Sequence, residues 1–214
     1  MKSKKLVQKI LNRLTPQCII NNKRKSLDQK EFEVWTKKGS PVPPPHLVKQ
    51  KAIKEYQEKT GNVYLIETGT YLGDMVEAQK KNFKKIYSIE LSDFLQKKAQ
   101  KRFKRNKNIK IVLGDSGKVL PQILENIYEP AIFWLDGHYS AGVTAKGDKE
   151  CPIFEELNAI FKSKKLDHVL LIDDARLFTG KGDYPTIEEL TQFVKSKNER
   201  YQLEVKDDII RYTI

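Results

Sequence analysis

Residues 63–73, VYLIETGTYLG, give the clearest indication of the fold. A mostly apolar run ends in an acid, Glu67. Gly69 follows, and Gly73 lies at the start of a helix-compatible segment at 72–83. A buried strand that runs through a glycine turn into a helix is the repeating unit of a parallel α/β sheet. The glycines would let the backbone approach a ligand closely at the start of that helix.

The same alternation continues along the chain. Apolar runs occur at 63–67, 86–90, 109–113, 131–136 and 168–173, and helix-compatible segments occur at 72–83, 92–105, 116–127, 151–163 and 186–197. Nearly continuous apolar strands predict a sheet with both faces covered. Residues 201–206 and 209–213, joined by a short turn, predict an antiparallel hairpin. The predicted fold class is α/β, a Rossmann-like three-layer sandwich whose seven-stranded, mostly parallel sheet is closed by a C-terminal hairpin.

Composition describes a chain of 214 residues with 39% hydrophobic and 32% charged residues and a mean hydropathy of −0.60. No run of 18 apolar residues occurs, so no transmembrane helix is expected. Lys9 and Arg13 interrupt what would be the core of a signal peptide, so the expected location is the cytoplasm. Cys18 and Cys151 have no metal-site spacing and are expected to be ordinary thiols.

Two parts are predicted: residues 1–45 as a basic helical arm with a Pro-rich linker, and residues 46–214 as the main domain. Residues 4–14 carry an apolar stripe typical of a short amphipathic helix, a polar stretch at 21–33 follows, and SPVPPPH at 40–46 precedes a helix at about 47–59. Residues 1–60 hold 15 Lys and Arg against 5 Asp and Glu, of a net charge of +12 for the chain. This surplus favours an anionic partner or, since lysine greatly outnumbers arginine, simply solvated helices.

Polar residues gather where the predicted strands end, which is where open α/β sheets bind ligands. The second strand ends at Glu90, 21 residues past Gly69, where an acid can bind both hydroxyls of a ribose. Gly69 and Gly73 form a G-x-x-x-G pattern with Thr70 between them, not the G-x-G-x-x-G that cradles a pyrophosphate. The loop therefore suits a cofactor without phosphates, whose amine Glu67 could help to hold.

Residues 62–214 resemble the class I S-adenosylmethionine-dependent methyltransferases, whose sheet has this seven-strand pattern. ETGTYLG matches the first motif of the family loosely, Glu90 matches the ribose-binding acid, and Asp115-Ser116 matches the pair beside adenine. The resemblance implies S-adenosylmethionine as cofactor. The residues it would contact are Glu67, Thr68, Gly69, Thr70, Tyr71, Gly73, Glu90, Asp115 and Ser116.

Aspartates end the fourth and fifth predicted strands: Asp136, Asp173 and Asp174. In the order that the resemblance implies, these strands are parallel neighbours, so their ends lie about 5 Å apart. Three carboxylates so close repel one another unless a cation neutralises them, and oxygen ligands favour Mg²⁺, or Mn²⁺ or Ca²⁺. The alternative is that Asp136 binds cofactor or substrate while Asp174 caps the turn.

The three aspartates match positions of the metal-dependent O-methyltransferases of the catechol and macrocin type. The Asp-Asp pair is closer to the macrocin-like, sugar-methylating branch, which carries an aspartate where this chain has His138. The resemblance implies metal-dependent methylation of a vicinal-diol hydroxyl, on a sugar of a surface glycan or a glycosylated metabolite. Asp136 and His138 are the predicted catalytic residues, His138 as the base; a structural or substrate-orienting histidine is the alternative.

Two glycine-bearing loops, 137–150 and 175–185, are expected to grip the substrate. Their first candidate contacts are Tyr139, Ser140, Lys146 and Arg176. A nucleic-acid-binding or RNA-modifying protein that uses the basic arm is the competing interpretation. The absence of an N-P-P-Y-like motif and of a Pro-Cys nucleophile argues against a nucleic-acid partner. The missing third glycine disfavours a nicotinamide-dependent oxidoreductase. The sequence allows a homo-oligomer and does not identify the acceptor.

Overall fold

A computed structural model describes residues 16–137, 151–164 and 166–214. The chain divides into two compact units, Met1–Val48 and Lys49–Ile214. The boundary predicted after residue 45 stays a prediction, and the helix predicted at 4–14 lies outside the described residues. In the first unit, helix α2 (Pro16–Lys37) includes the polar stretch at 21–33. Beyond its end, the Trp35 indole N–H donates a hydrogen bond to the Pro41 carbonyl at 2.6 Å.

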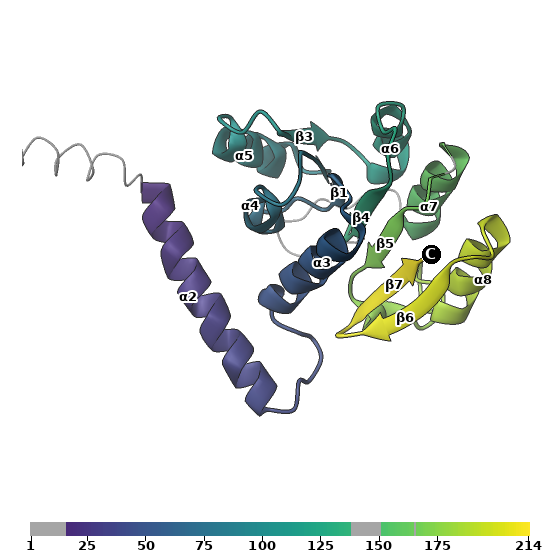
Figure 1. Ribbon diagram of the computed structural model, residues 1–214, viewed down its shortest axis with the longest axis horizontal. Coiled ribbons are helices and arrows are strands. Elements are labelled where there is room, and N and C mark those ends of the chain that lie inside the picture. The colour runs from purple at the N-terminus through teal and green to yellow at the C-terminus, as the bar shows by residue number, and fades with distance from the viewer. Residues whose placement is uncertain (1–15, 138–150, 165) are drawn as a thin grey trace, which may run out of the picture. The chain divides into compact units, whose positions relative to one another are not determined.

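The second unit contains one seven-stranded sheet in the order β3-β2-β1-β4-β5-β7-β6. Its strands are β1 (Tyr64–Thr68), β2 (Lys85–Glu90), β3 (Ile109–Leu113), β4 (Ala131–Leu135), β5 (Val169–Ile172), β6 (Gln202–Lys206) and β7 (Ile209–Thr213). The first five are parallel, whereas β7 runs antiparallel to both β5 and β6. Figure 1 shows this hairpin in yellow at one edge of the sheet. The predicted fold class is confirmed.

Helices cover both faces of the sheet (Figure 1). They are α3 (His46–Thr60), α4 (Asp74–Gln79), α5 (Asp93–Phe103), α6 (Ser116–Leu124), α7 (Ile153–Lys162) and α8 (Ile187–Lys197), and a 3₁₀ turn, η1 (Ala175–Leu177), follows β5. Local signals set several bounds: the Ser92 hydroxyl caps α5, the Asp115 carboxylate caps α6, and Thr186 with Glu189 forms a capping box at α8. Every helix expected between residues 47 and 197 is present.

Two apolar cores hold the three layers together. One lies between the sheet and α3, α4 and α5, and includes Ile53, Val76 and Phe103. The other lies between the sheet and α6, α7 and α8, and includes Leu120, Leu157, and Leu190. Trp134 of β4 is buried in the first core. No helix in the described part of the chain is long and apolar enough to span a bilayer.

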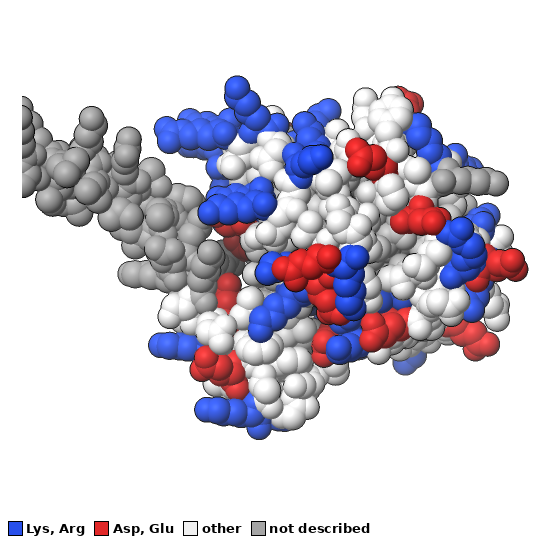
Figure 2. Space-filling view, viewed as in Figure 1, with Lys and Arg blue, Asp and Glu red and all other residues white. Residues whose placement is uncertain are grey.

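Charged side chains are unevenly spread over the face drawn in Figure 2. Basic side chains gather over α5, where residues 97–105 include six Lys and Arg. Elsewhere on this face, acidic and basic side chains are interspersed. The basic surplus of the sequence is therefore expressed partly on the sheet unit and not only in residues 1–60.

Candidate active site

Acidic side chains line the carboxyl ends of four adjoining strands. Residues two apart along a strand face the same side of the sheet, and Leu65, Trp134 and Leu171 face the core under α3, α4 and α5. The alternation carries acids onto this same face. They are Glu90 at the end of β2, Glu67 in β1, Asp136 after β4 and Asp173 after β5, called the acid row below.

Strand register brings the members of this row together. Thr68 of β1 pairs with Leu135 of β4, and Leu135 pairs with Ile172 of β5, so Asp136 and Asp173 follow on neighbouring strands. The Asp173 backbone N–H donates to the Leu135 carbonyl at 3.1 Å, which extends the ladder one residue beyond the strands. The sequence-based expectation that the fourth and fifth strands are parallel neighbours is confirmed.

The glycine loop after β1 lies against the end of β4. Gly69 has φ +84, and a Cβ atom added there would come within 2.2 Å of the Asp136 carbonyl oxygen. Its N–H and that of Thr70 donate to the Ile89 carbonyl of β2, at 2.9 and 3.1 Å. The Tyr71 N–H donates to the Glu90 carboxylate at 2.7 Å. Glycine is required at position 69 for two reasons, the left-handed backbone and the close approach.

Glu67 is buried and lies beside Ser88 of β2, which donates a hydrogen bond to its carboxylate. The Ser88 hydroxyl also lies 2.5 Å from that of Thr70 in the glycine loop. Burial raises the pKa of Glu67 to about 8; the Ser88 hydrogen bond lowers it, and the nearby Glu90 raises it further. At neutral pH this carboxyl is mostly protonated, and a cation placed beside it would ionise it.

Asp136 is positioned by Thr68. Its backbone N–H donates to the Thr68 carbonyl at 3.2 Å and to the Thr68 hydroxyl at 3.1 Å. Burial raises the pKa of the Asp136 carboxyl well above its ordinary value; Asp173 raises it further, and Lys49 opposes the shift. Burial and the neighbouring acids therefore both disfavour the ionised form of the Asp136 carboxyl.

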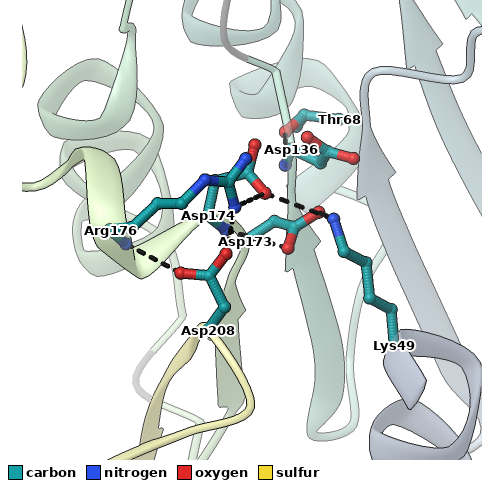
Figure 3. A network of polar contacts seen from close by, with 7 residues as sticks. All are labelled: Lys49, Thr68, Asp136, Asp173, Asp174, Arg176 and Asp208. Atoms are coloured by element: carbon teal, nitrogen blue, oxygen red, sulfur yellow. Dashed lines mark hydrogen bonds and ion pairs between the residues drawn. The ribbon is translucent and has the colours of Figure 1, made fainter. Parts of the chain in front are cut away.

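Lys49 projects from the first turn of α3 into the acid row (Figure 3). Its ammonium donates to the Asp173 carboxylate at 2.5 Å and to the Asp174 carboxylate at 3.2 Å. The Lys49 side chain is 16% exposed and that of Asp173 is 1% exposed. Burial lowers the pKa of Lys49, but the aspartates outweigh it, and the net pKa is raised. Lys49 therefore stays protonated, and the sequence analysis did not identify it.

A second cation reaches Asp174 from the loop after β5. Arg176 donates to the Asp174 carboxylate at 2.9 Å and also contacts Asp208, which lies in the turn between β6 and β7. The other Asp208 carboxylate oxygen accepts from the Arg176 backbone N–H at 2.8 Å. The C-terminal hairpin thus fixes the loop that carries Asp174 (Figure 3). Arg176 was predicted as a substrate contact, and its side chain here is engaged with these two acids.

The predicted metal site has a different arrangement from the one expected. Asp136, Asp173 and Asp174 do converge, but an ammonium lies between the last two. Among residues 16–137, 151–164 and 166–214, no group of three or more His, Cys, Asp or Glu side chains is arranged to hold a metal ion. His138, the predicted base, and Tyr139, Ser140 and Lys146 lie outside the described residues.

Asp115 and Ser116, predicted beside adenine, have structural partners. The Asp115 carboxylate accepts from the Gly117 backbone N–H at 3.0 Å as the cap of α6. The Ser116 hydroxyl donates to the Glu156 carboxylate of α7 at 2.5 Å. These contacts cap α6 and link its first residue to α7, and the role of the pair in cofactor binding stays a prediction.

Comparison with known proteins finds similar structures but no similar sequence. No protein-family model and no curated protein matches this sequence. An O-methyltransferase from Bacillus cereus in complex with SAH is similar in structure, with a TM-score of 0.58 and 15% identity over 88% of this chain and 91% of that one. The O-methyltransferase TomG from Streptomyces achromogenes, in complex with SAM, has a TM-score of 0.56 and 14% identity over 87% and 86%.

The SAH-bound methyltransferase PaMTH1 from Podospora anserina is similar at a TM-score of 0.52, with 14% identity over 77% of each chain. At such identities the likeness concerns the fold. The chain therefore has the fold of the class I S-adenosylmethionine-dependent methyltransferases, as its motifs suggest.

Proposed function

We propose that this protein is an S-adenosylmethionine-dependent O-methyltransferase. The observation that carries the proposal is the acid row beside the Gly69 loop, at the carboxyl ends of the central strands. Open α/β sheets bind their ligands at this edge. The row is acidic and buried, so it favours a ligand that brings positive charge. The similarity of the fold to methyltransferases supports the same assignment.

The residues of the row suit the parts of this cofactor. Bound S-adenosylmethionine supplies a methyl group on a positively charged sulfonium. Gly69 allows the backbone to approach the ligand, and Glu90, which already orients the loop through Tyr71, would accept hydrogen bonds from the ribose hydroxyls. Glu67 would ionise next to the amino group. Thr68, Thr70 and Gly73 would keep the loop in shape, and Asp115 and Ser116 would lie at the adenine end.

Transfer to a hydroxyl requires that its proton leave as the oxygen–carbon bond forms and the carbon–sulfur bond breaks. Among the described residues, Asp136 is suited to accept this proton, because its raised pKa makes its carboxylate a stronger base than an ordinary aspartate. Asp136 also lies against the glycine loop, next to where the cofactor would bind. His138, two residues further on, is the other candidate base.

The divalent cation predicted at Asp136, Asp173 and Asp174 does not fit this arrangement. Carboxylate oxygens are ligands that Mg²⁺ prefers, but Lys49 already binds two of the three. A divalent ion would have to displace a buried ammonium and leave Lys49 without its partners. We therefore assign no step of the reaction to a metal. The acceptor that we propose is a hydroxyl of a vicinal diol on a sugar, in line with the sugar-methylating branch that Asp173-Asp174 resembles.

Calorimetric titration with S-adenosylhomocysteine tests the cofactor assignment. The wild type should bind it, and Glu90→Ala should weaken binding about 10- to 100-fold, the worth of hydrogen bonds to a charged group. Glu58→Ala is the matched control, since Glu58 is an exposed acid paired only with Lys54 on α3 among the ion pairs described. If the wild type shows no heat of binding and no thermal shift, the cofactor assignment is wrong.

Incubation of cell extracts with labelled S-adenosylmethionine, followed by mass spectrometry, tests the acceptor. Label on an oxygen of a sugar supports the proposal. Label on a nucleobase or an amine, if it is absent when the Asp136→Ala variant is used, would show that the protein is not an O-methyltransferase.

A further inference from the structure

The cation of the acid row comes from the chain itself. We propose that Lys49 takes the place that a divalent metal ion would have, and that it holds Asp173 and Asp174 in position as a permanent positive charge. Lys49 is a positioning residue in this account: it acts through the carboxylates that it binds. The inference goes beyond the proposed function, because it concerns which cation the site contains.

Geometry is the first argument. The Lys49 ammonium donates to Asp173 at 2.5 Å and to Asp174 at 3.2 Å, from a helix packed over the same face of the sheet as the acid row. Consecutive residues of an extended chain point to opposite sides, but Asp174 has a left-handed backbone, φ 57 and ψ 48. This turn brings both carboxylates to one ammonium. A non-glycine residue held in this region is uncommon, so the surroundings must favour it.

Charge is the second argument. Asp173 is fully buried, and Asp136 interacts electrostatically with Asp173, Asp174 and Lys49 at once. The two aspartates cannot bind this mostly buried ammonium and a doubly charged ion at the same time. The two cations would repel each other at contact distance in a poorly solvated site. Lys49 binds Asp173 Oδ2 and Asp174 Oδ1, Arg176 donates to the same Asp174 oxygen, and Asp173 Oδ1 accepts the Asp174 backbone N–H.

Two consequences follow. The wild type should lack a tight divalent-cation site, and its activity should persist in EDTA. Replacing Lys49 with an uncharged side chain should leave three mutually repelling carboxylates that recruit a hard cation. The change from lysine to a neutral residue would therefore create a metal site and not simply remove a contact.

Mn²⁺ binding measures this directly, by the loss of the free-ion signal in electron paramagnetic resonance. Lys49→Met, close to lysine in length, should bind Mn²⁺ at least ~10-fold more tightly than the wild type. Lys49→Met combined with Asp173→Asn should lose the gain, which locates it at this site. Lys49→Arg, which keeps the charge, and Lys54→Met, on the exposed side of the same helix, should bind Mn²⁺ like the wild type.

Equal Mn²⁺ affinity of the wild type and Lys49→Met would overturn the proposal. Tight binding of Mn²⁺ by the wild type that is lost in Asp173→Asn would also overturn it. If Lys49→Met does not fold, the wild type and Asp173→Asn still decide, by melting temperature with Mn²⁺ or with EDTA. No change for either protein supports the proposal; a rise for the wild type that Asp173→Asn removes contradicts it. These measurements need no methyl donor or acceptor, so their failure is distinguishable from failure of the S-adenosylhomocysteine titration.

Discussion

Three residues of this site have a backbone conformation or a degree of burial that is unfavourable for their residue type. Asp174 has a left-handed backbone, Glu67 is a fully buried acid, and the ammonium of Lys49 is withdrawn from water. Each of these costs free energy unless a partner offsets it. The partners of Asp174 and Lys49 lie within the chain, whereas Glu67 has only hydroxyl and acidic neighbours among its described contacts. Glu67 is therefore stable in the free protein as the protonated acid, and a cationic ligand beside it would favour its ionised form.

The affinity for S-adenosylhomocysteine should rise with pH between about 6.5 and 8. The free protein holds Glu67 protonated up to its pKa of about 8, and the ligand's ammonium would lower that pKa, so binding releases a proton. Titrations in buffers of different ionisation enthalpy measure the proton directly. Glu67→Gln should flatten the profile, and Glu58→Gln should leave it unchanged. A wild-type affinity independent of pH would mean that the ligand does not reach Glu67.

Acids at the ends of strands are predictable from sequence, but their partner is not. An apolar run that stops at Asp136 or Asp173 shows both where the strand ends and which edge of the sheet the carboxylate reaches. Lys49 is one of three lysines in the stretch KQKAIK at 49–54, and nothing local separates the buried one from its exposed neighbours. Its role depends on how a helix docks on strands more than 120 residues away. The sequence does not identify Asp208 either, because it looks like an ordinary turn residue and its partner, Arg176, is distant in the chain.

Individual helices and strands are defined by signals that lie inside them. All seven strands were expected within one or two residues, since each is a short apolar run between turn residues. Helix α2 is the exception: residues 21–33 show no apolar stripe, and a pattern-based prediction needs one. The loops between the elements carry much of the site, and they are shaped by contacts between elements. The Gly69 loop, which fits against the end of β4, shows this best.

Gly69→Ala should destabilise the protein more than Gly61→Ala. Both glycines have a left-handed backbone, φ +84 and φ +69, so both substitutions cost about 1 kcal/mol or slightly more in strain. Only at position 69 does the new methyl group collide with backbone, the Asp136 carbonyl; position 61, just after α3, is open. Urea unfolding should give a loss of about 3 kcal/mol for Gly69→Ala, including overpacking. Equal losses of unfolding free energy for the two variants would show that the Gly69 loop can move away from the Asp136 carbonyl without cost.

The stability of the fold should depend on pH through two sets of buried groups whose effects oppose one another. Burial lowers the pKa of His168 to about 4, and its neutral ring accepts the Ala131 N–H at 3.1 Å. Between pH 6.5 and 4 the unfolded chain takes up a proton that the folded chain does not, so stability falls as pH falls. Glu67, Asp136 and Asp173 have raised pKa values, so their effect is opposite. They stabilise the fold most at low pH, and this contribution is lost as pH rises from the ordinary carboxyl range through the raised values, which for Glu67 means up to about pH 8.

The His168 part of this profile has a specific test. From pH 7 to pH 5, protonation of the unfolded histidine should lower the unfolding free energy by about 2 kcal/mol, against the opposite contribution of the buried carboxyls. His168→Asn keeps a hydrogen-bond acceptor but does not titrate, so its unfolding free energy should change by about 2 kcal/mol more favourably than that of the wild type over the same range. Urea unfolding at the two pH values measures the difference. An identical change in both proteins would show that His168 does not contribute to the pH dependence.

The ion pairs between Lys49 and the two aspartates should also constrain how these positions change in evolution. A lineage that lost the lysine alone would keep acids that repel one another, and one that lost the acids alone would keep a stranded ammonium. Positions 49, 173 and 174 should therefore mutate in concert, or a line without the lysine should have acquired an inorganic ion in its place. Such joint inheritance can be looked for in genomes, without purifying any protein.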